Sequence, residues 1–152
     1  MSLISKLGKN NENLSTILLA YEQELENARE LIAIEHKTLE QANRENATWH
    51  YFYAVKKAEL QALVKYFEAE VESVRGNLFK TLTKTNQRDL SDRAKDKFID
   101  SEEAFLTINE VYLEVKEVYD KYSALVDAFV TRGYALNNIT KARVAEVHNM
   151  VL

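Results

Sequence analysis

The chain has 152 residues, with no Cys, no Pro, three Gly and a formal net charge of -4. This length fits one domain and is too short for two cores of ordinary size. The scarcity of turn residues excludes collagen-like and loop-rich chains and argues against β-sandwiches and barrels. The absence of Cys excludes disulfide frameworks and thiolate metal sites. The sequence therefore predicts an all-α protein built from long helices.

The N-terminal third predicts an acidic helical arm. Apolar or small residues return at spacings of four and three from Leu14 to Ile32 and again from Leu39 to Tyr53, which is typical of a helical seam. Residues 43–48 have low helix propensity, so the pattern fits either a break there or one continuous helix. With the break, the arm spans residues 1–46 and a helical core spans residues 47–152, and we expect the two to fold as one cooperative unit.

Three further elements follow along the chain. Apolar residues between positions 60 and 82 follow an eleven-residue repeat, which predicts a nearly straight helix over residues 47–84. Residues 85–92 carry cap-type side chains and predict a connection. A short helix is expected at residues 93–99. Asp100, with Glu103 three residues later, is expected to cap a last long helix that begins near residue 101 and ends near residue 149.

An apolar stripe in the last predicted helix is the clearest pattern in the chain. Its members alternate at spacings of three and four: Phe105, Ile108, Tyr112, Val115, Tyr119, Tyr122, Val126 and Phe129. A second row at residues 111, 118 and 125 makes the stripe wider than a two-stranded seam. The helix would be ~70 Å long, and one short chain has little with which to cover it. We therefore expect an elongated hairpin or bundle that assembles into a homo-oligomer through these eight residues.

No catalytic or metal-binding motif occurs in the sequence. A di-iron bundle needs Glu three residues before His, and Ala33, Ala47 and Ala145 occupy those positions. The H-E-x-x-H, G-x-S-x-G and P-loop patterns do not occur either. We expect no enzyme activity, no cofactor and no metal. The apolar runs are too short for a signal peptide or a membrane span, so we expect a cytoplasmic protein.

Charge is segregated along the chain. Residues 12–45 carry eight acids against three bases, and residues 102–127 carry seven acids against two, which gives a net charge of -5 in each segment. Residues 75–97 carry seven bases against three acids, a net charge of +4. A basic segment of this kind is typical of a solvated helix end or of a surface that binds phosphates. Its candidate nucleic-acid contacts are Arg75, Phe79, Lys80, Lys84, Arg88, Arg93, Lys95 and Lys97. Phe79 and the aromatics upstream, at residues 51–53, 66 and 67, include candidates for stacking on bases, although most of them are expected to face the core.

Residues 98–143 resemble the C-terminal helix of the UvsY family of phage recombination mediators. The strongest local match lies within residues 125–143, where an aliphatic run, Arg, aromatic, Ile and Arg follow in the family's order. The Arg, aromatic, Ile and Arg are Arg132, Tyr134, Ile139 and Arg143, and Asp127 precedes them in the match. Upstream, Lys56, Lys57 and Leu60 begin a helix rich in Lys and Glu, as in that family, and extend the resemblance to residues 49–143.

The resemblance implies a ring-like homo-oligomer that binds single-stranded DNA in recombination, repair and replication. Such mediators help a RecA-like recombinase displace a single-strand DNA-binding protein, and a phage-encoded member acts in the host cytoplasm. The family's DNA contacts imply a basic cluster near Arg75, Lys80 and Lys84, although its Lys-x-Arg spacing is missing here. Lys56 and Lys57 join the candidate contacts. The alternative is a helical structural or adaptor protein that contacts only partner helices. The net negative charge disfavours membrane binding.

Overall fold

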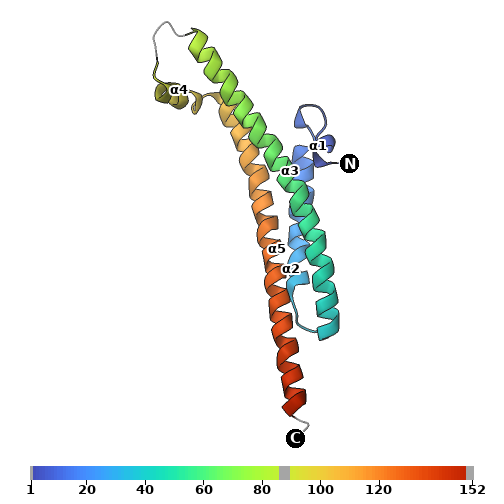
Figure 1. The fold of residues 1–152 in the computed structure, drawn as a ribbon. Helices are drawn as coiled ribbons and strands as arrows, with labels where there is room; N and C mark the ends of the chain where they lie inside the picture. The colour runs from blue at the N-terminus through green and yellow to red at the C-terminus, as the bar shows by residue number, and fades with distance from the viewer. Residues whose placement is uncertain (1, 86–89, 150–152) are drawn as a thin grey trace.

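The computed structural model describes residues 2–85 and 90–149, with side chains up to residue 146, and all regular structure in this part is helical. The elements are α1 (Leu3–Lys6), the short 3-10 turn η1 (Lys9–Asn11), α2 (Leu14–Ile32), α3 (Leu39–Thr85), α4 (Asp92–Ile99) and α5 (Glu103–Asn149). α3 and α5 form a long antiparallel hairpin, α4 lies where the hairpin turns, and α2 packs beside both long helices in the other half (Figure 1). None of the described helices is both long and apolar enough to cross a bilayer. The predicted all-α fold is confirmed.

The boundary between α2 and α3 lies at residues 33–38. Thr38 caps α3, because its hydroxyl oxygen accepts a hydrogen bond from the backbone N–H of Gln41 at 3.2 Å. His36, in the turn before it, adopts a left-handed conformation with φ of 62°. Asn43 and Thr48 stay helical, and their side chains donate to backbone carbonyls one turn earlier at 3.0 and 3.1 Å. The predicted break at residues 43–48 is therefore wrong, and the proposed boundary at residue 46 falls inside α3.

The elements around the hairpin turn lie close to their predicted positions. α4 begins at Asp92, one residue before the predicted start, and the predicted connection includes residues 86–89, which lie outside the described part. α5 begins at Glu103. The predicted capping role of Asp100 is wrong, because Asp100 ends α4 by donating its backbone N–H to the carbonyl of Asp96 at 2.9 Å. The carboxylate of Asp100 pairs with Arg75 at 2.7 Å.

The apolar stripe of α5 packs inside the single chain. Phe105, Val115, Tyr122, Val126 and Phe129 are buried, while Ile108, Tyr112 and Tyr119 are half-buried beside them. Their partners are apolar residues of α2, α3 and α4, and the ring of Tyr53 stacks on that of Phe129 with centroids 5.6 Å apart. The expectation that one chain cannot cover this stripe is wrong. Five of these eight residues lie in the core of the hairpin, and the other three pack against it.

Polar contacts within this core hold α2 in place. The hydroxyl of Tyr122 donates to the backbone carbonyl of Tyr21 at 3.0 Å, and the hydroxyl of Tyr21 donates to Glu59 of α3 at 2.7 Å. Burial is the main cause that raises the pKa of both phenols far above its usual range. Both tyrosines are therefore neutral at physiological pH and act as hydrogen-bond donors that join three helices.

Candidate nucleic-acid interface

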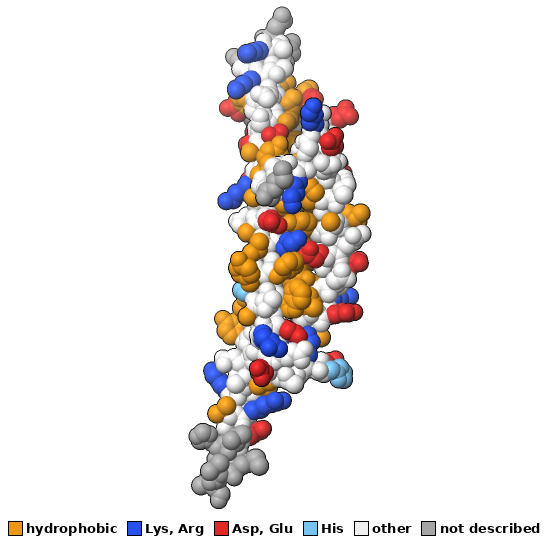
Figure 2. All heavy atoms as spheres, turned by 90° about the vertical axis from the view of Figure 1, so that its right-hand side faces the viewer, with side chains coloured by type: hydrophobic (Ala, Val, Ile, Leu, Met, Phe, Trp, Pro, Cys, Tyr) orange, Lys and Arg blue, Asp and Glu red, His pale blue; other side chains and the backbone are white. Residues whose placement is uncertain are grey.

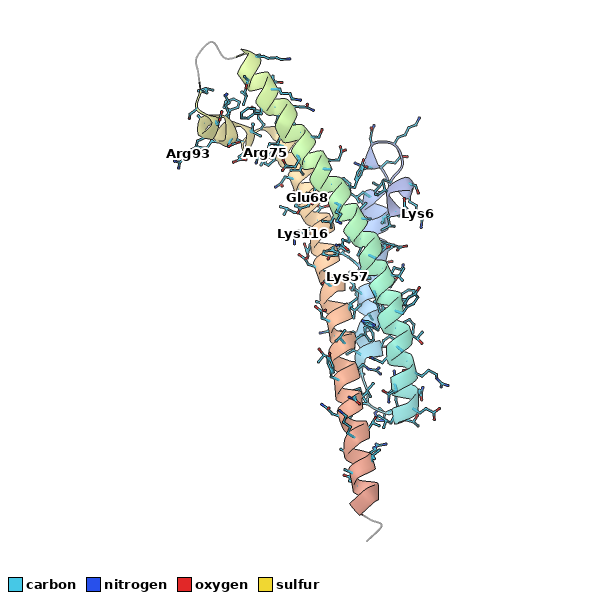
Figure 3. All side chains as sticks on the ribbon, viewed as in Figure 1. Lys6, Lys57, Glu68, Arg75, Arg93 and Lys116 are labelled. Carbon is cyan, nitrogen blue, oxygen red and sulfur yellow. The ribbon has the colours of Figure 1, made fainter. Side chains whose placement is uncertain are left out.

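Four of the predicted basic contacts are exposed at the hairpin turn. Lys80 and Lys84 follow each other by one turn near the end of α3, and Arg93 and Lys97 do the same on α4. None of the four makes an ion pair with a residue that the structure describes. We call these four residues the basic tip. Their charges are available to an anionic ligand, and Arg93 projects from the outer side of α4 (Figure 3).

Three other candidates from the same segment have structural partners. Arg75 pairs with Asp96 at 3.4 Å and with Asp100 at 2.7 Å, and its guanidinium lies 4.7 Å from the ring centre of Phe105. Lys95 lies over the half-buried ring of Phe79 at 4.9 Å. These contacts fix α4 against the hairpin. The interpretation of Arg75, Phe79 and Lys95 as free DNA contacts is therefore not supported by their surroundings.

The remaining candidates lie outside the basic tip. Lys56 pairs with Glu24 of α2 at 3.2 Å and lies 4.8 Å from the ring centre of Tyr21. Lys57 is half-buried, with its amine 6.0 Å from the ring centre of Tyr119. Arg88 lies outside the described residues. Lys56 and Lys57 thus join α3 to its neighbouring helices.

An exposed aromatic patch on α3 contains Tyr51 and Phe52, two of the aromatics that the sequence offered for stacking without showing which of them face solvent. Tyr51 is 72% exposed, and Phe52 and Val55 are also exposed beside it. Phe52 packs edge-on against Trp49 and Tyr53, with ring centres 5.9 and 5.1 Å apart. A signal was present, because Tyr53 alone of the three adjacent aromatics falls on the heptad seam. Tyr51 is two positions away from Tyr53 and must therefore point away from the core.

Tyr51 belongs to a continuous exposed strip on the outer side of α3. Successive residues of an α-helix are rotated by roughly 100° about its axis. We define the outer strip as the residues between Arg44 and Thr83 that lie within about 50° of Tyr51 around this axis. They are Arg44, Ala47, Tyr51, Val55, Ala58, Ala62, Lys65, Ala69, Ser73, Gly76, Lys80 and Thr83. All are exposed except the half-buried Gly76, where an added Cβ would meet no atom within 4 Å. Between Arg44 and Thr83 the strip holds three bases and no acid. Glu40 lies on the same face one turn before the strip begins, Glu72 lies at its edge, and the other four glutamates of α3 lie on other faces.

The outer strip connects the aromatic patch to the basic tip. Figure 2 views the molecule from the side on which α1 and the first half of α3 lie, and it shows hydrophobic side chains gathered midway, with Lys, Arg, Asp and Glu side chains among them and towards both ends. Tyr51 and Lys84 are separated by 33 residues of continuous helix, which span ~50 Å. This surface can offer stacking at one end and cations at the other. Nowhere in the described part of the chain do three His, Asp or Glu gather as metal ligands would.

No protein-family model, no curated protein sequence and no solved structure matches this chain.

Proposed function

We propose that the protein binds single-stranded DNA along the outer strip of α3 and at the basic tip. The observation that carries this proposal is the absence of acids from the outer strip, in a chain whose net charge is -4. Phosphates are repelled by carboxylates and attracted by Lys and Arg, so a strand avoids the acidic faces of this molecule and follows the outer strip. Small side chains between Val55 and Lys80 let a strand approach the helix closely.

The aromatic patch favours a single strand over a duplex. A single strand exposes the faces of its bases, which stack on aromatic side chains without regard to sequence. Tyr51 offers such a face at the far end of the outer strip. A duplex keeps its bases paired and stacked inside, so it gains only the electrostatic contribution from this surface.

The proposed cellular role is that of a recombination mediator. Such a protein loads a RecA-like recombinase onto DNA that a single-strand DNA-binding protein covers, and it acts as a homo-oligomer. This role rests on the resemblance of residues 49–143 to the UvsY family. The alternative, an adaptor that acts only through contacts with partner helices, predicts no DNA binding at all.

Removal of the basic tip is expected to weaken DNA binding. Changing Lys80, Lys84, Arg93 and Lys97 to Ala should lower the affinity for an oligo(dT) strand at least about tenfold at ~0.05 M salt. The slope of log affinity against log salt should also become shallower, by about 0.7 for each phosphate that the variant no longer neutralises. Fluorescence anisotropy over a salt series measures both quantities.

A matched control removes the same charge from elsewhere. Lys6, Lys9, Arg29 and Lys121 are exposed and lie outside α3 and α4, and changing them to Ala alters the net charge by the same amount. The control should lose less affinity than the tip variant. Equal losses would show a general charge effect and count against the basic tip. Loss of binding on changing Lys141 and Arg143 would place the site at the other end of the hairpin.

The aromatic patch gives a separate prediction. Tyr51→Ala should weaken binding to a single strand by about fivefold or more, since stacking of one base contributes ~1–3 kcal/mol. Tyr134→Ala is the matched control, because Tyr134 is similarly exposed at 68% but lies on α5. Both variants should keep the helical circular dichroism and the unfolding midpoint of the unaltered chain. Equal affinities of the two variants would exclude Tyr51 from the DNA site.

A further inference from the structure

A groove of about 380 Å³ lies between α2 and α5, and no residue of α3 lines it. Its apolar surface comes from Leu18, Leu19 and Val118. Leu18 and Val118 are buried, whereas Leu19 is 56% exposed. A large aliphatic side chain beside a hollow of this kind leaves apolar area open to water that a partner could cover.

The exposed apolar surface continues along α5. Leu113 is 53% exposed and lines an adjoining hollow together with Ala124. Glu117 lines both hollows, so they adjoin at this carboxylate. Leu19 and Leu113 therefore lie in neighbouring hollows, the first between α2 and α5 and the second on α5 alone.

Carboxylates line both hollows beside the exposed leucines. Glu22, Glu114 and Glu117 line the groove, and Asp120 lines the adjoining hollow. Only two cations lie among them. Lys121 pairs with Glu117 at 2.7 Å and with Glu22 at 3.1 Å, and Lys116 pairs with Asp120 at 2.7 Å. The four acids and two bases leave a net charge of -2.

Both lysines are already engaged by these acids. Lys121 donates hydrogen bonds to Glu117 and Glu22, which raise its pKa, and Lys116 donates to Asp120, which raises the pKa of Lys116. Glu114 makes no ion pair with any residue in the described part of the chain. A cation on a ligand would find in Glu114 an acceptor that the protein itself does not neutralise.

We propose that the groove between α2 and α5 binds an amphipathic helix with a basic face, supplied by a partner protein. Apolar side chains of that helix would cover Leu19 and Leu113, and its Lys or Arg side chains would pair with Glu114 and the neighbouring acids. α2 and α5 run side by side, so a third helix packs along them as a further ridge. Nucleic acid is excluded as the occupant, because the rim would repel phosphates. The inference is independent of the DNA-binding proposal, since it uses the opposite charge and other helices.

The test uses the full chain and a synthetic peptide as the probe. The peptide is about 18 residues long, carries fluorescein, and has Leu at spacings of three and four with Lys at the other positions. Anisotropy at ~0.15 M salt should show saturable binding, and the same peptide with Glu in place of Lys should not bind. A double variant, L19S with E114Q, should bind the Lys peptide at least about tenfold more weakly.

The control variant makes the same changes away from the groove. Leu90 and Glu70 are exposed, so L90S with E70Q matches the substitution types and the charge change. This control should bind the Lys peptide like the unaltered chain, and both variants should retain their circular dichroism. Equal weakening in the two variants would show that the peptide binds only by general charge attraction, which would overturn the proposal. Self-association of the unaltered chain that L19S with E114Q abolishes would show that a second copy fills the groove, which would overturn an external partner.

Discussion

Arg132→Ala should lower the free energy of unfolding by about 3 kcal/mol or more, because it removes a buried donor on which several backbone and side-chain acceptors depend. Arg132 is 3% exposed. Its Nε donates to the carbonyl of Ile32 at 3.0 Å, at the end of α2. Its Nη1 donates to the carbonyl of Ala42 at 2.9 Å and to the side chain of Asn46 at 3.1 Å, in the first turns of α3. One side chain of α5 thus fixes the turn that joins the other two helices.

Two opposing influences act on the pKa of Arg132. Desolvation lowers the pKa of the guanidinium, and the charge of Glu45 opposes that shift. Gly133 next to it lies so close to α3 that an added Cβ would be 3.1 Å from the amide nitrogen of Asn46. Arg132 and Gly133 therefore form one packing unit against α3.

Urea unfolding followed by circular dichroism measures the predicted loss. Arg143→Ala is the control, because Arg143 lies on the same helix but is exposed, and its change should alter stability by no more than about 0.5 kcal/mol. Arg132→Lys should also be destabilising, since an ammonium cannot reproduce the planar fork of donors. Amide exchange should rise first in α2, whose end loses its anchor. Equal stability of the Arg132→Ala and Arg143→Ala variants would contradict this role.

The sequence predicted long helices but left open whether residues 14–84 form one or two, and its candidate break was misplaced. Residues 43–48 have low intrinsic propensity, and tertiary packing overrides it, because Ala42 and Tyr53 are buried against α5. The true boundary had a local signal in Thr38 followed by Gln41, which form a capping pattern. The predicted break rested on low propensity alone and took no account of this cap, which marks where α3 begins.

The site was predicted less well than the fold because free and paired charges look alike in a sequence. Arg75 and Lys80 belong to the same basic segment, yet only Arg75 has acids within reach, on the turn after α4 and on α4 itself. Those partners are 21 and 25 residues away in sequence, so only the hairpin geometry brings them together. Tyr51 was considered for stacking only as one of a group of aromatics expected mostly in the core. Its position relative to the seam is what distinguishes it from that group and places it in solvent.

The same limit explains why the stripe of α5 was assigned to contacts between chains. Its width indicates several helical partners, but periodicity does not say whether those partners belong to the same chain. The structure supplies them from α2, α3 and α4. Packing within one chain and contact between chains predict different effects of a charged substitution in the stripe. Val115 is the position that distinguishes the two interpretations most clearly.

Val115→Asp should unfold the chain or destabilise it by about 4 kcal/mol or more at pH 7, because Val115 is fully buried and a carboxylate there has no partner. The matched control is Val115→Asn. The Asn side chain has the same shape as that of Asp but carries no charge, so this variant should be less destabilising. Burial raises the pKa of such a carboxyl in the folded state above its unfolded value of roughly 3.9. The difference in the free energy of unfolding between the two variants should therefore be largest above the pKa of the carboxyl in the folded state. It should shrink as the pH falls towards the pKa in the unfolded state.

Circular dichroism and sedimentation together distinguish a core position from an interface between subunits. If Val115 lies in the core of each chain, Val115→Asp loses helical signal at neutral pH at every protein concentration, and its unfolding midpoint does not depend on that concentration. If Val115 lay between subunits, the same change would yield folded, separate chains with the helical content retained. A folded monomer in place of an unfolded chain would restore the stripe of α5 as an assembly surface. Loss of helix in Val115→Asp, with partial recovery in Val115→Asn, is the expected result.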